Sequence, residues 1–165
     1  MTQRLWRIAV GADDAGFQYK EAIAADLTDD TRVSSVVDFG VERGETTPYA
    51  SVGLAVAESV ARGEADRAVL ICGTGIGMAI SANKVPGVRA TTVSDSYSCE
   101  RSVLSNDCQI ITFGQRVVGL ELARRLVREW LGYEFDPASP SNSKVGVISA
   151  YERRGDHGDH PLSCS

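Results

Sequence analysis

The sequence predicts a single α/β domain built on a five-stranded parallel sheet. Short runs rich in β-branched residues alternate with segments of helical periodicity, which is the pattern of parallel α/β architecture. The chain has 165 residues, enough for one domain with a substantial core. Its hydrophobic content of 43% and charged content of 24% are ordinary for a soluble protein, so we expect one globular unit without an interdomain linker.

Five segments are expected to form the strands. Each run is too short and too continuously apolar to be assigned from periodicity alone. The regular spacing and the flanking glycines favour strands over helices. The predicted strands cover residues 7–10, 35–39, 67–71, 89–93 and 109–113.

Apolar residues repeat at helical spacing between these strands, which predicts amphipathic helices. Shorter helices are expected over 77–84 and 96–105. The three longer stripes are Tyr19, Ile23 and Leu27, then Val52, Val56 and Val60, then Leu120, Ala123, Val127 and Trp130 between Gly119 and Gly132.

The C-terminal part is expected to differ from the rest of the domain. An amphipathic segment around Val145, Ile148 and Tyr151 is short for an isolated helix, so we expect it to dock on another surface. We place the domain at 1–152. The polar, Gly- and Asp-rich residues 153–165 are expected to form a flexible tail.

Charge and apolar pattern exclude several functions. A net charge of −5 argues against nucleic acid as a partner, because binding to phosphate backbones needs a basic face. No apolar run approaches the roughly 20 residues of a membrane span, and Met1 to Arg7 show no secretory signal. None of the four cysteines forms a CxxC pair, which favours reduced thiols and a cytoplasmic location.

Both histidines, His157 and His160, lie in the expected tail. Without further ligands nearby, they are not expected to bind a metal ion. Any proton chemistry in residues 1–156 must therefore use thiol, carboxylate, hydroxyl or amine groups.

A glycine-rich loop follows the third predicted strand and reads Cys72-Gly73-Thr74-Gly75-Ile76-Gly77. Its place matters because ligands of parallel sheets bind beyond the carboxyl ends of the strands. Alternating glycines let successive backbone N–H groups point at one spot, which suits a phosphate or a developing oxyanion. The spacing is not that of a dinucleotide fingerprint. Phe17-Gln18 after Gly16 likewise argues against a nucleotide triphosphate loop.

Cys72 is the candidate proton-transferring base. The dipoles of the loop favour its thiolate form. The alternative is that Cys72 is only a small buried hydrophobic residue at the end of a strand. Cys99 and Cys108 have no comparable surroundings, and Cys164 lies in the tail.

A series of short motifs runs almost without gaps from about Ile8 to Tyr151. They are Asp13-x-Ala15-Gly16, Asp38-Phe39-Gly40, Gly63-Glu64-Ala65-Asp66, Ile71-Cys72-Gly73-Thr74-Gly75-Ile76-Gly77, Ala82-Asn83-Lys84, Gly87-x-Arg89-Ala90, Asn106-Asp107 and Phe113-Gly114-x-Arg116-Val117. By this highly specific set the chain resembles the ribose-5-phosphate isomerase B / galactose-6-phosphate isomerase family. The resemblance implies a three-layer, Rossmann-like fold. It also implies a homodimer or dimer of dimers with shared active sites, a small sugar-phosphate substrate, and no metal or organic cofactor.

The resemblance also implies roles for individual residues. Cys72 matches the thiol that moves a proton between C1 and C2, and Thr74 matches a hydroxyl that helps to move the proton between O1 and O2. The N–H groups of Gly73, Gly75, Ile76 and Gly77 match the anion hole for a cis-enediolate. Substrate-binding positions are matched by Asp13, Tyr49, Asn106 and Arg116. Asp13 could instead, or in addition, cap a helix, and Tyr49 could belong to the core.

Three departures from the family pattern concern the substrate. Asp14 stands where the family has a histidine, and Ser105 stands where the ring-opening histidine precedes Asn-Asp. The usual phosphate clamp reads Ser139-Pro140-Ser141…Lys144, so only Lys144 keeps a cation. A four-carbon sugar with phosphate on O4 cannot form a furanose and needs no ring opening. We therefore expect an isomerase of erythrulose 4-phosphate and erythrose 4-phosphate.

Two alternatives remain open. The chain could be a pentose- or hexose-phosphate isomerase that opens rings with another residue or receives an open substrate. It could also be a non-catalytic sugar-phosphate-binding subunit, although the retention of Cys72, Thr74 and the glycine loop argues against this.

Overall fold

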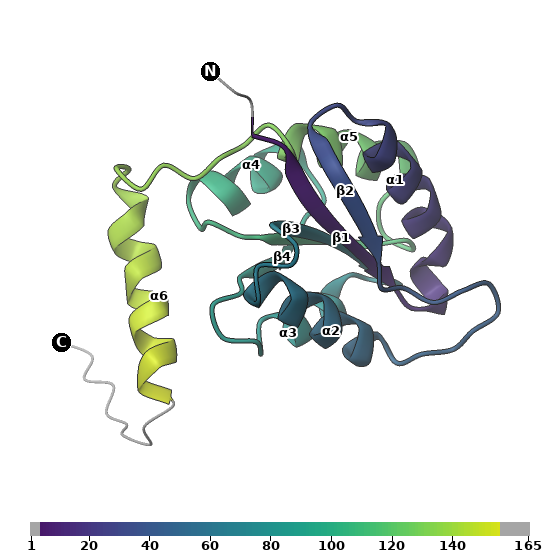
Figure 1. Ribbon diagram of the computed structural model, residues 1–165, viewed down its shortest axis with the longest axis horizontal. Helices are drawn as coiled ribbons and strands as arrows, with labels where there is room; N and C mark the ends of the chain where they lie inside the picture. Colours follow the sequence, from purple (N-terminus) through teal and green to yellow (C-terminus); the bar gives the residue numbers. More distant parts are fainter. Residues whose placement is uncertain (1–3, 156–165) are drawn as a thin grey trace.

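The computed structural model describes residues 4–155 and has the predicted α/β architecture. Strands and helices alternate along the chain, and every predicted strand and helix is present (Figure 1). The elements are β1 (Trp6–Ala12), a 3₁₀ turn η1 (Asp14–Gly16), α1 (Phe17–Asp29), β2 (Val33–Asp38), α2 (Tyr49–Ala61), β3 (Arg67–Cys72), α3 (Ile76–Ala82), β4 (Ala90–Thr92), α4 (Ser96–Leu104), β5 (Ile110–Gly114), α5 (Leu120–Trp130) and α6 (Ser141–Gly155).

All five strands are parallel, in the order β2-β1-β3-β5-β4. Every residue of the central strand β3 is buried, as expected for a strand covered on both faces. Strand β4 at one edge is shorter than the predicted segment 89–93, because only Ala90 to Thr92 pair with β5. The register aligns Cys72 with Gly114 and Ala12 with Ile71, so β1, β3 and β5 end side by side.

Helices form one layer on each face of the sheet, which gives the expected three-layer, Rossmann-like arrangement (Figure 1). Helices α1, α4 and α5 pack on one face, against a core that includes Val69 and Ile71. Helices α2 and α3 pack on the other face, against Leu70 and Cys72. This division follows from the alternation of side chains along a strand. It directs the Cys72 side chain toward α2 and α3.

Helix α6 lies beside the β4 edge, apart from both helical layers (Figure 1). The expected docking of this segment is met at Val145, which is 7% exposed, whereas Ile148 is 45% exposed. The helix also continues past the expected boundary at 152, because its last turn contains Arg153 and Arg154 and ends at Gly155. The rest of the predicted tail, with its histidines and Cys164, lies outside the described residues.

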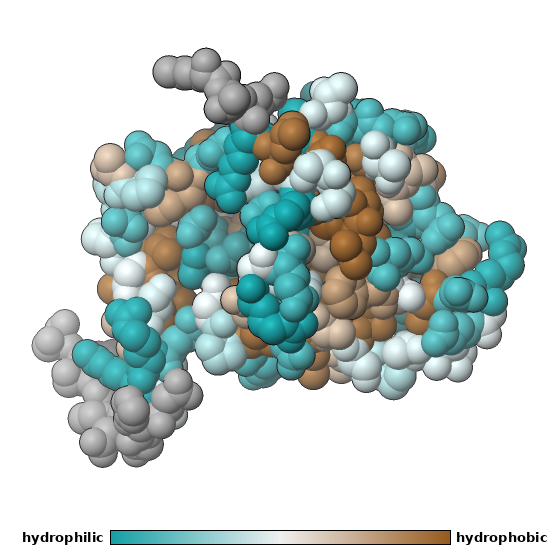
Figure 2. Space-filling model, viewed as in Figure 1, coloured by the Kyte–Doolittle hydropathy of each residue, from teal (hydrophilic) through white to brown (hydrophobic). Residues whose placement is uncertain are grey.

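Hydrophobic residues are exposed over β2, where Val37 is 48% exposed, and on α6 (Figure 2). Within residues 4–155, none of the helices combines the length and the apolar character that a bilayer span requires.

Candidate active site

The candidate site is built around Cys72, the last residue of β3. Its Sγ accepts a hydrogen bond from the backbone N–H of Gly75, over 3.0 Å. Cys72 is 5% exposed and belongs to the core cluster beneath α2 and α3, so it is a small buried residue as the alternative interpretation held. Its sulfur nevertheless accepts a hydrogen bond from the glycine loop, whereas a thiol that only fills space in the core would contact apolar groups.

Gly75 fixes the shape of the loop. Its φ of +80° lies in the left-handed region that favours glycine, and an added Cβ would come within 2.9 Å of the carbonyl carbon of Phe113. The hydroxyl of Thr112, on β5, donates to the Gly75 carbonyl over 2.8 Å. Sequence reasoning missed this contribution of Thr112. The available signal was a hydroxyl inside an otherwise apolar central strand.

The loop leads into α3, which begins at Ile76. The N–H groups of Gly77 and Met78 belong to the first turn, where a helix provides no acceptor for them. Thr74 is exposed, and its Oγ1 accepts a hydrogen bond from the Ile76 N–H over 3.3 Å. The segment therefore places a hydroxyl and several N–H donors beside the sulfur, an arrangement that can stabilise negative charge.

Arg116 approaches the loop from the end of β5. Its backbone N–H donates to the Gly73 carbonyl over 3.0 Å, and the neighbouring Gln115 N–H donates to the Cys72 carbonyl over 2.9 Å. The guanidinium packs on Gly73, since a Cβ built there would lie 3.3 Å from Arg116 Nη1. The register of β3 with β5 thus brings a cation to the loop.

Asp13 approaches from the other side, because it follows Ala12 at the end of β1. Its Oδ1 accepts a hydrogen bond from the Gly16 N–H over 3.1 Å, which confirms its role as a helix N-cap. Burial raises the pKa of the Asp13 carboxyl above its ordinary value, and the charge of neighbouring Asp14 raises it further. Asp14 itself is exposed at the start of η1.

Tyr49 packs on the start of α3, beside the glycine loop. It is the first residue of α2, and its ring lies on Gly77, where an added Cβ would come within 2.5 Å of Cε2. The residue is 46% exposed, so the alternative assignment of Tyr49 to the core is wrong. Its phenol stands at the surface near the glycine loop, as expected for a group that contacts a ligand.

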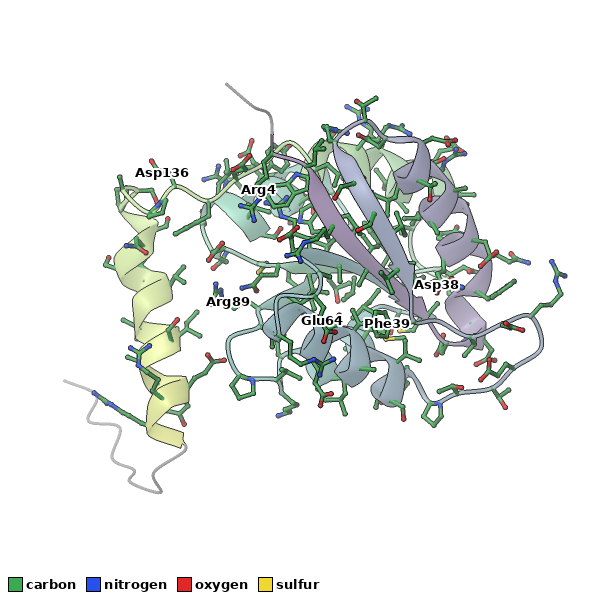
Figure 3. All side chains as sticks on the ribbon, viewed as in Figure 1. Arg4, Asp38, Phe39, Glu64, Arg89 and Asp136 are labelled. Atoms are coloured by element: carbon green, nitrogen blue, oxygen red, sulfur yellow. The ribbon has the colours of Figure 1, made fainter. Side chains whose placement is uncertain are left out.

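Asn106 and Lys144 lie far from Cys72 in the same chain. Asn106 lies before β5, near the amino end of the sheet, where its Nδ2 donates to the Arg101 carbonyl over 3.1 Å. Strand β5 rises by about 13 Å from Ile110, at that edge, to Gly114, which lies beside Cys72. Lys144 is in the first turns of α6, beside the β4 edge. Figure 3 shows this division, with Asp38 and Phe39 at the carboxyl end of β2 and Arg89 on the side of α6.

A single chain therefore assembles one part of the predicted site and leaves another part outside it. The carboxyl edge brings together Cys72, Thr74, Gly73, Gly75, Ile76, Gly77, Asp13, Asp14, Tyr49 and Arg116. Among the described residues, no group of three or more His, Cys, Asp or Glu side chains is arranged to hold a metal ion.

A parallel α/β domain with a thiol beside a loop of backbone donors defines a class of protein that binds small anionic ligands at the carboxyl edge of its sheet. A family model described as Ribose/Galactose Isomerase matches residues 8–148. The chain belongs to this family.

Individual relatives agree with this assignment. D-erythrulose-4-phosphate isomerase 2 of Mycolicibacterium smegmatis is 62% identical over 147 residues, which cover 88% of this chain and 97% of that protein. Ribose-5-phosphate isomerase B of Escherichia coli is 43% identical, over 90% of this chain and 97% of the relative. The solved structure of Clostridium thermocellum ribose-5-phosphate isomerase B has 42% identity and a TM-score of 0.85, and the match covers 90% of this chain and 99% of that one. The expected family, fold and enzyme class, an aldose–ketose isomerase, are thereby confirmed.

Proposed function

We propose that this protein interconverts the ketose D-erythrulose 4-phosphate and the aldose D-erythrose 4-phosphate, both in their open forms, through a cis-enediolate. The observation that carries the proposal is the absence of imidazole from residues 1–156. It agrees with the expectation that Ser105 replaces the ring-opening histidine of the family. A tetrose with phosphate on O4 has no hydroxyl left to close a furanose, so this enzyme needs no acid to open one. The 62% identity to a D-erythrulose-4-phosphate isomerase supports the same substrate.

The chemistry is assigned to Cys72 and the loop that holds it. The thiolate takes a proton from C1 of the ketose, and the electron pair of the broken C–H bond forms the C1–C2 double bond of the enediolate. Charge on O2 is stabilised by the loop N–H groups and by the Arg116 guanidinium, which act most strongly on charge that develops during the reaction. The Thr74 hydroxyl helps to move the proton from O1 to O2. Cys72 then returns its proton to C2, which leaves an aldehyde at C1.

Asp13 and Tyr49 are proposed to hold substrate hydroxyls. Asp13 keeps one carboxylate oxygen on the Gly16 N–H, and we assign the contact with the substrate to its other oxygen. The Tyr49 phenol is exposed above Gly77. Asp14 is proposed to line the same end of the site.

The complete site is proposed to form between two copies of this chain, as a homodimer or a dimer of dimers. Asn106 and Lys144 lie too far from Cys72 of their own chain to touch the same tetrose phosphate. A second copy would supply them in a symmetric dimer, in which each subunit completes the other's site. The half-exposed Ile148 on α6 is available for such an interface. The reaction requires a reduced thiol, which accords with the cytoplasmic location that we propose.

A pentose phosphate is the second candidate substrate, because a relative named ribose-5-phosphate isomerase B is 43% identical to this chain over 148 residues. The deciding experiment measures kcat/KM of the purified protein on erythrulose 4-phosphate, ribulose 5-phosphate and a ketohexose 6-phosphate. We expect the tetrose phosphate to be the best substrate, and a higher kcat/KM on the pentose would overturn the assignment. Ser105→His should raise activity on ribose 5-phosphate relative to the tetrose.

A further inference from the structure

A cavity of about 470 Å³ lies between β4, α4 and α6, at the end of the sheet that holds Asn106. Its charged lining groups are two guanidiniums, those of Arg89 and Arg101, and no carboxylate appears among its described lining residues. Asn106 and Ile148 also line it. Two guanidiniums without a carboxylate in the lining suit an anionic ligand, although the motifs of the sequence assign no phosphate-binding role to Arg89 or Arg101.

The two guanidiniums differ in how freely they can bind a ligand. The Arg89 side chain is 13% exposed and is held by Asp107 and by the carbonyls of Asn106 and Asp107. The Arg101 side chain is 39% exposed, and its ion pair with Glu100 is also open to solvent. Exposed ion pairs contribute little free energy, so a dianionic ligand can compete with Glu100 for Arg101.

Arg101 also contacts the position at which we expect this chain to depart from its family. Its Nη1 donates to the Ser105 Oγ over 3.3 Å, one helical turn further along α4. Ser105 precedes Asn106, which is proposed to hold a substrate hydroxyl. Arg101 therefore stands beside Ser105 and Asn106, on α4 and the turn that follows it, whereas Lys144 belongs to α6.

We propose that Arg101 binds the substrate phosphate and, together with Lys144, replaces the family's phosphate clamp. This inference rests on the proposed function and identifies the phosphate subsite of the same site. Lys144 lies one turn before Ile148 on the same face of α6, and Ile148 lines the cavity. The planar fork of Arg101 matches two phosphate oxygens at once, whereas Lys144 offers a point charge.

The test compares Arg101→Gln and Arg101→Lys with the matched control Arg125→Gln. Arg125 is likewise a helical arginine in an exposed ion pair, with Glu129 on α5, away from the cavity. We expect Arg101→Gln to raise KM for erythrulose 4-phosphate about 10- to 100-fold with a smaller change in kcat, and Arg101→Lys to recover part of the loss. Arg125→Gln should match the wild type. An unchanged KM in Arg101→Gln would overturn the assignment.

A second measurement separates this inference from the proposed substrate. Inorganic phosphate is titrated calorimetrically into the wild-type protein and each variant, with circular dichroism and size-exclusion chromatography to show that fold and assembly are unchanged. We expect Arg101→Gln to weaken phosphate binding about tenfold or more. Equal binding by Arg101→Gln and the wild type, or no binding by the wild type, would refute the role of Arg101. If the wild type prefers a pentose phosphate, the proposed substrate fails while the titration still decides the role of Arg101.

Discussion

The sulfur of Cys72 lies 3.0 Å from the backbone nitrogen of Gly75, which donates a hydrogen bond to it. The donor belongs to a residue whose φ of +80° and contact with Phe113 leave the loop little freedom. The proposed base is therefore held by main-chain geometry.

Cys72→Ala should lower kcat by about two to four orders of magnitude, because it removes the group that moves the proton. KM should change much less, since the hydroxyl- and phosphate-binding residues remain. Steady-state kinetics on erythrulose 4-phosphate measure both constants, and Cys164→Ser serves as the control. A variant without the sulfur that keeps wild-type turnover would exclude the proposed mechanism.

Gly75→Ala should abolish activity and destabilise the fold more than Gly87→Ala. The two glycines have nearly the same φ, +80° and +81°, but a Cβ at Gly87 meets nothing within 4 Å. Gly87→Ala should therefore lower the free energy of unfolding by about 1 kcal/mol, the cost of a left-handed alanine, and leave kcat intact. Urea denaturation and kinetics of both variants provide the comparison. A Gly75→Ala variant with the kcat of the wild type would show that the shape of the glycine loop does not matter.

A mixed dimer of Cys72→Ala and Asn106→Ala subunits should regain activity that neither variant has alone. In a shared-site dimer, one of the two sites of a heterodimer carries both intact residues, so statistical assembly restores about a quarter of wild-type turnover. Co-expression of differently tagged subunits gives the mixture for assay. If each subunit instead contained a complete site of its own, the mixture would recover no activity.

The stability of Asp13→Asn should depend on pH. The pKa of Asp13 is raised in the folded state, so its ionisation opposes folding. This effect is absent below the unfolded pKa near 3.8 and is complete above the folded pKa. Asparagine can still accept the Gly16 N–H, so the variant should be more stable than the wild type at pH 7, by less than about 1 kcal/mol after solvent screening. The gain should vanish near pH 3.5 in urea denaturation, whereas kcat/KM should fall at neutral pH. A variant that is less stable at both pH values would contradict this account of Asp13.

Thiol labelling should select Cys72 in a Cys164→Ser background. Burial raises the pKa of Cys99 to about 12 and that of Cys108 to about 11, so both stay protonated at pH 8. Iodoacetamide should modify one thiol per native chain, with inactivation at the same rate and protection by erythrulose 4-phosphate. Mass spectrometry identifies the labelled peptide. Faster labelling of Cys99 or Cys108 would argue against the special position of Cys72.

The sequence predicted the sheet and the glycine loop because each signal was local. The apolar runs at 67–71 and 109–113 predicted β3 and β5, and the glycines after Cys72 predicted the loop. The bond from Thr112 to Gly75 depends on strand register, and the contact of Arg101 with Ser105 depends on one side-chain conformation. Neither could be derived from spacing alone. The continuation of α6 to Gly155 was missed because its last turn is polar and resembles a tail in composition.

Because Asn106 and Cys72 lie at opposite edges of one sheet, the specific activity of the protein should depend on its concentration. If neither edge can convert substrate alone, specific activity per subunit should fall when the protein is diluted below the dissociation constant of the proposed dimer. An inactive variant produced in the same cell would also lower the activity of the normal protein. In a mixed dimer, the inactive subunit would contribute a defective residue to a site that it shares with the normal subunit.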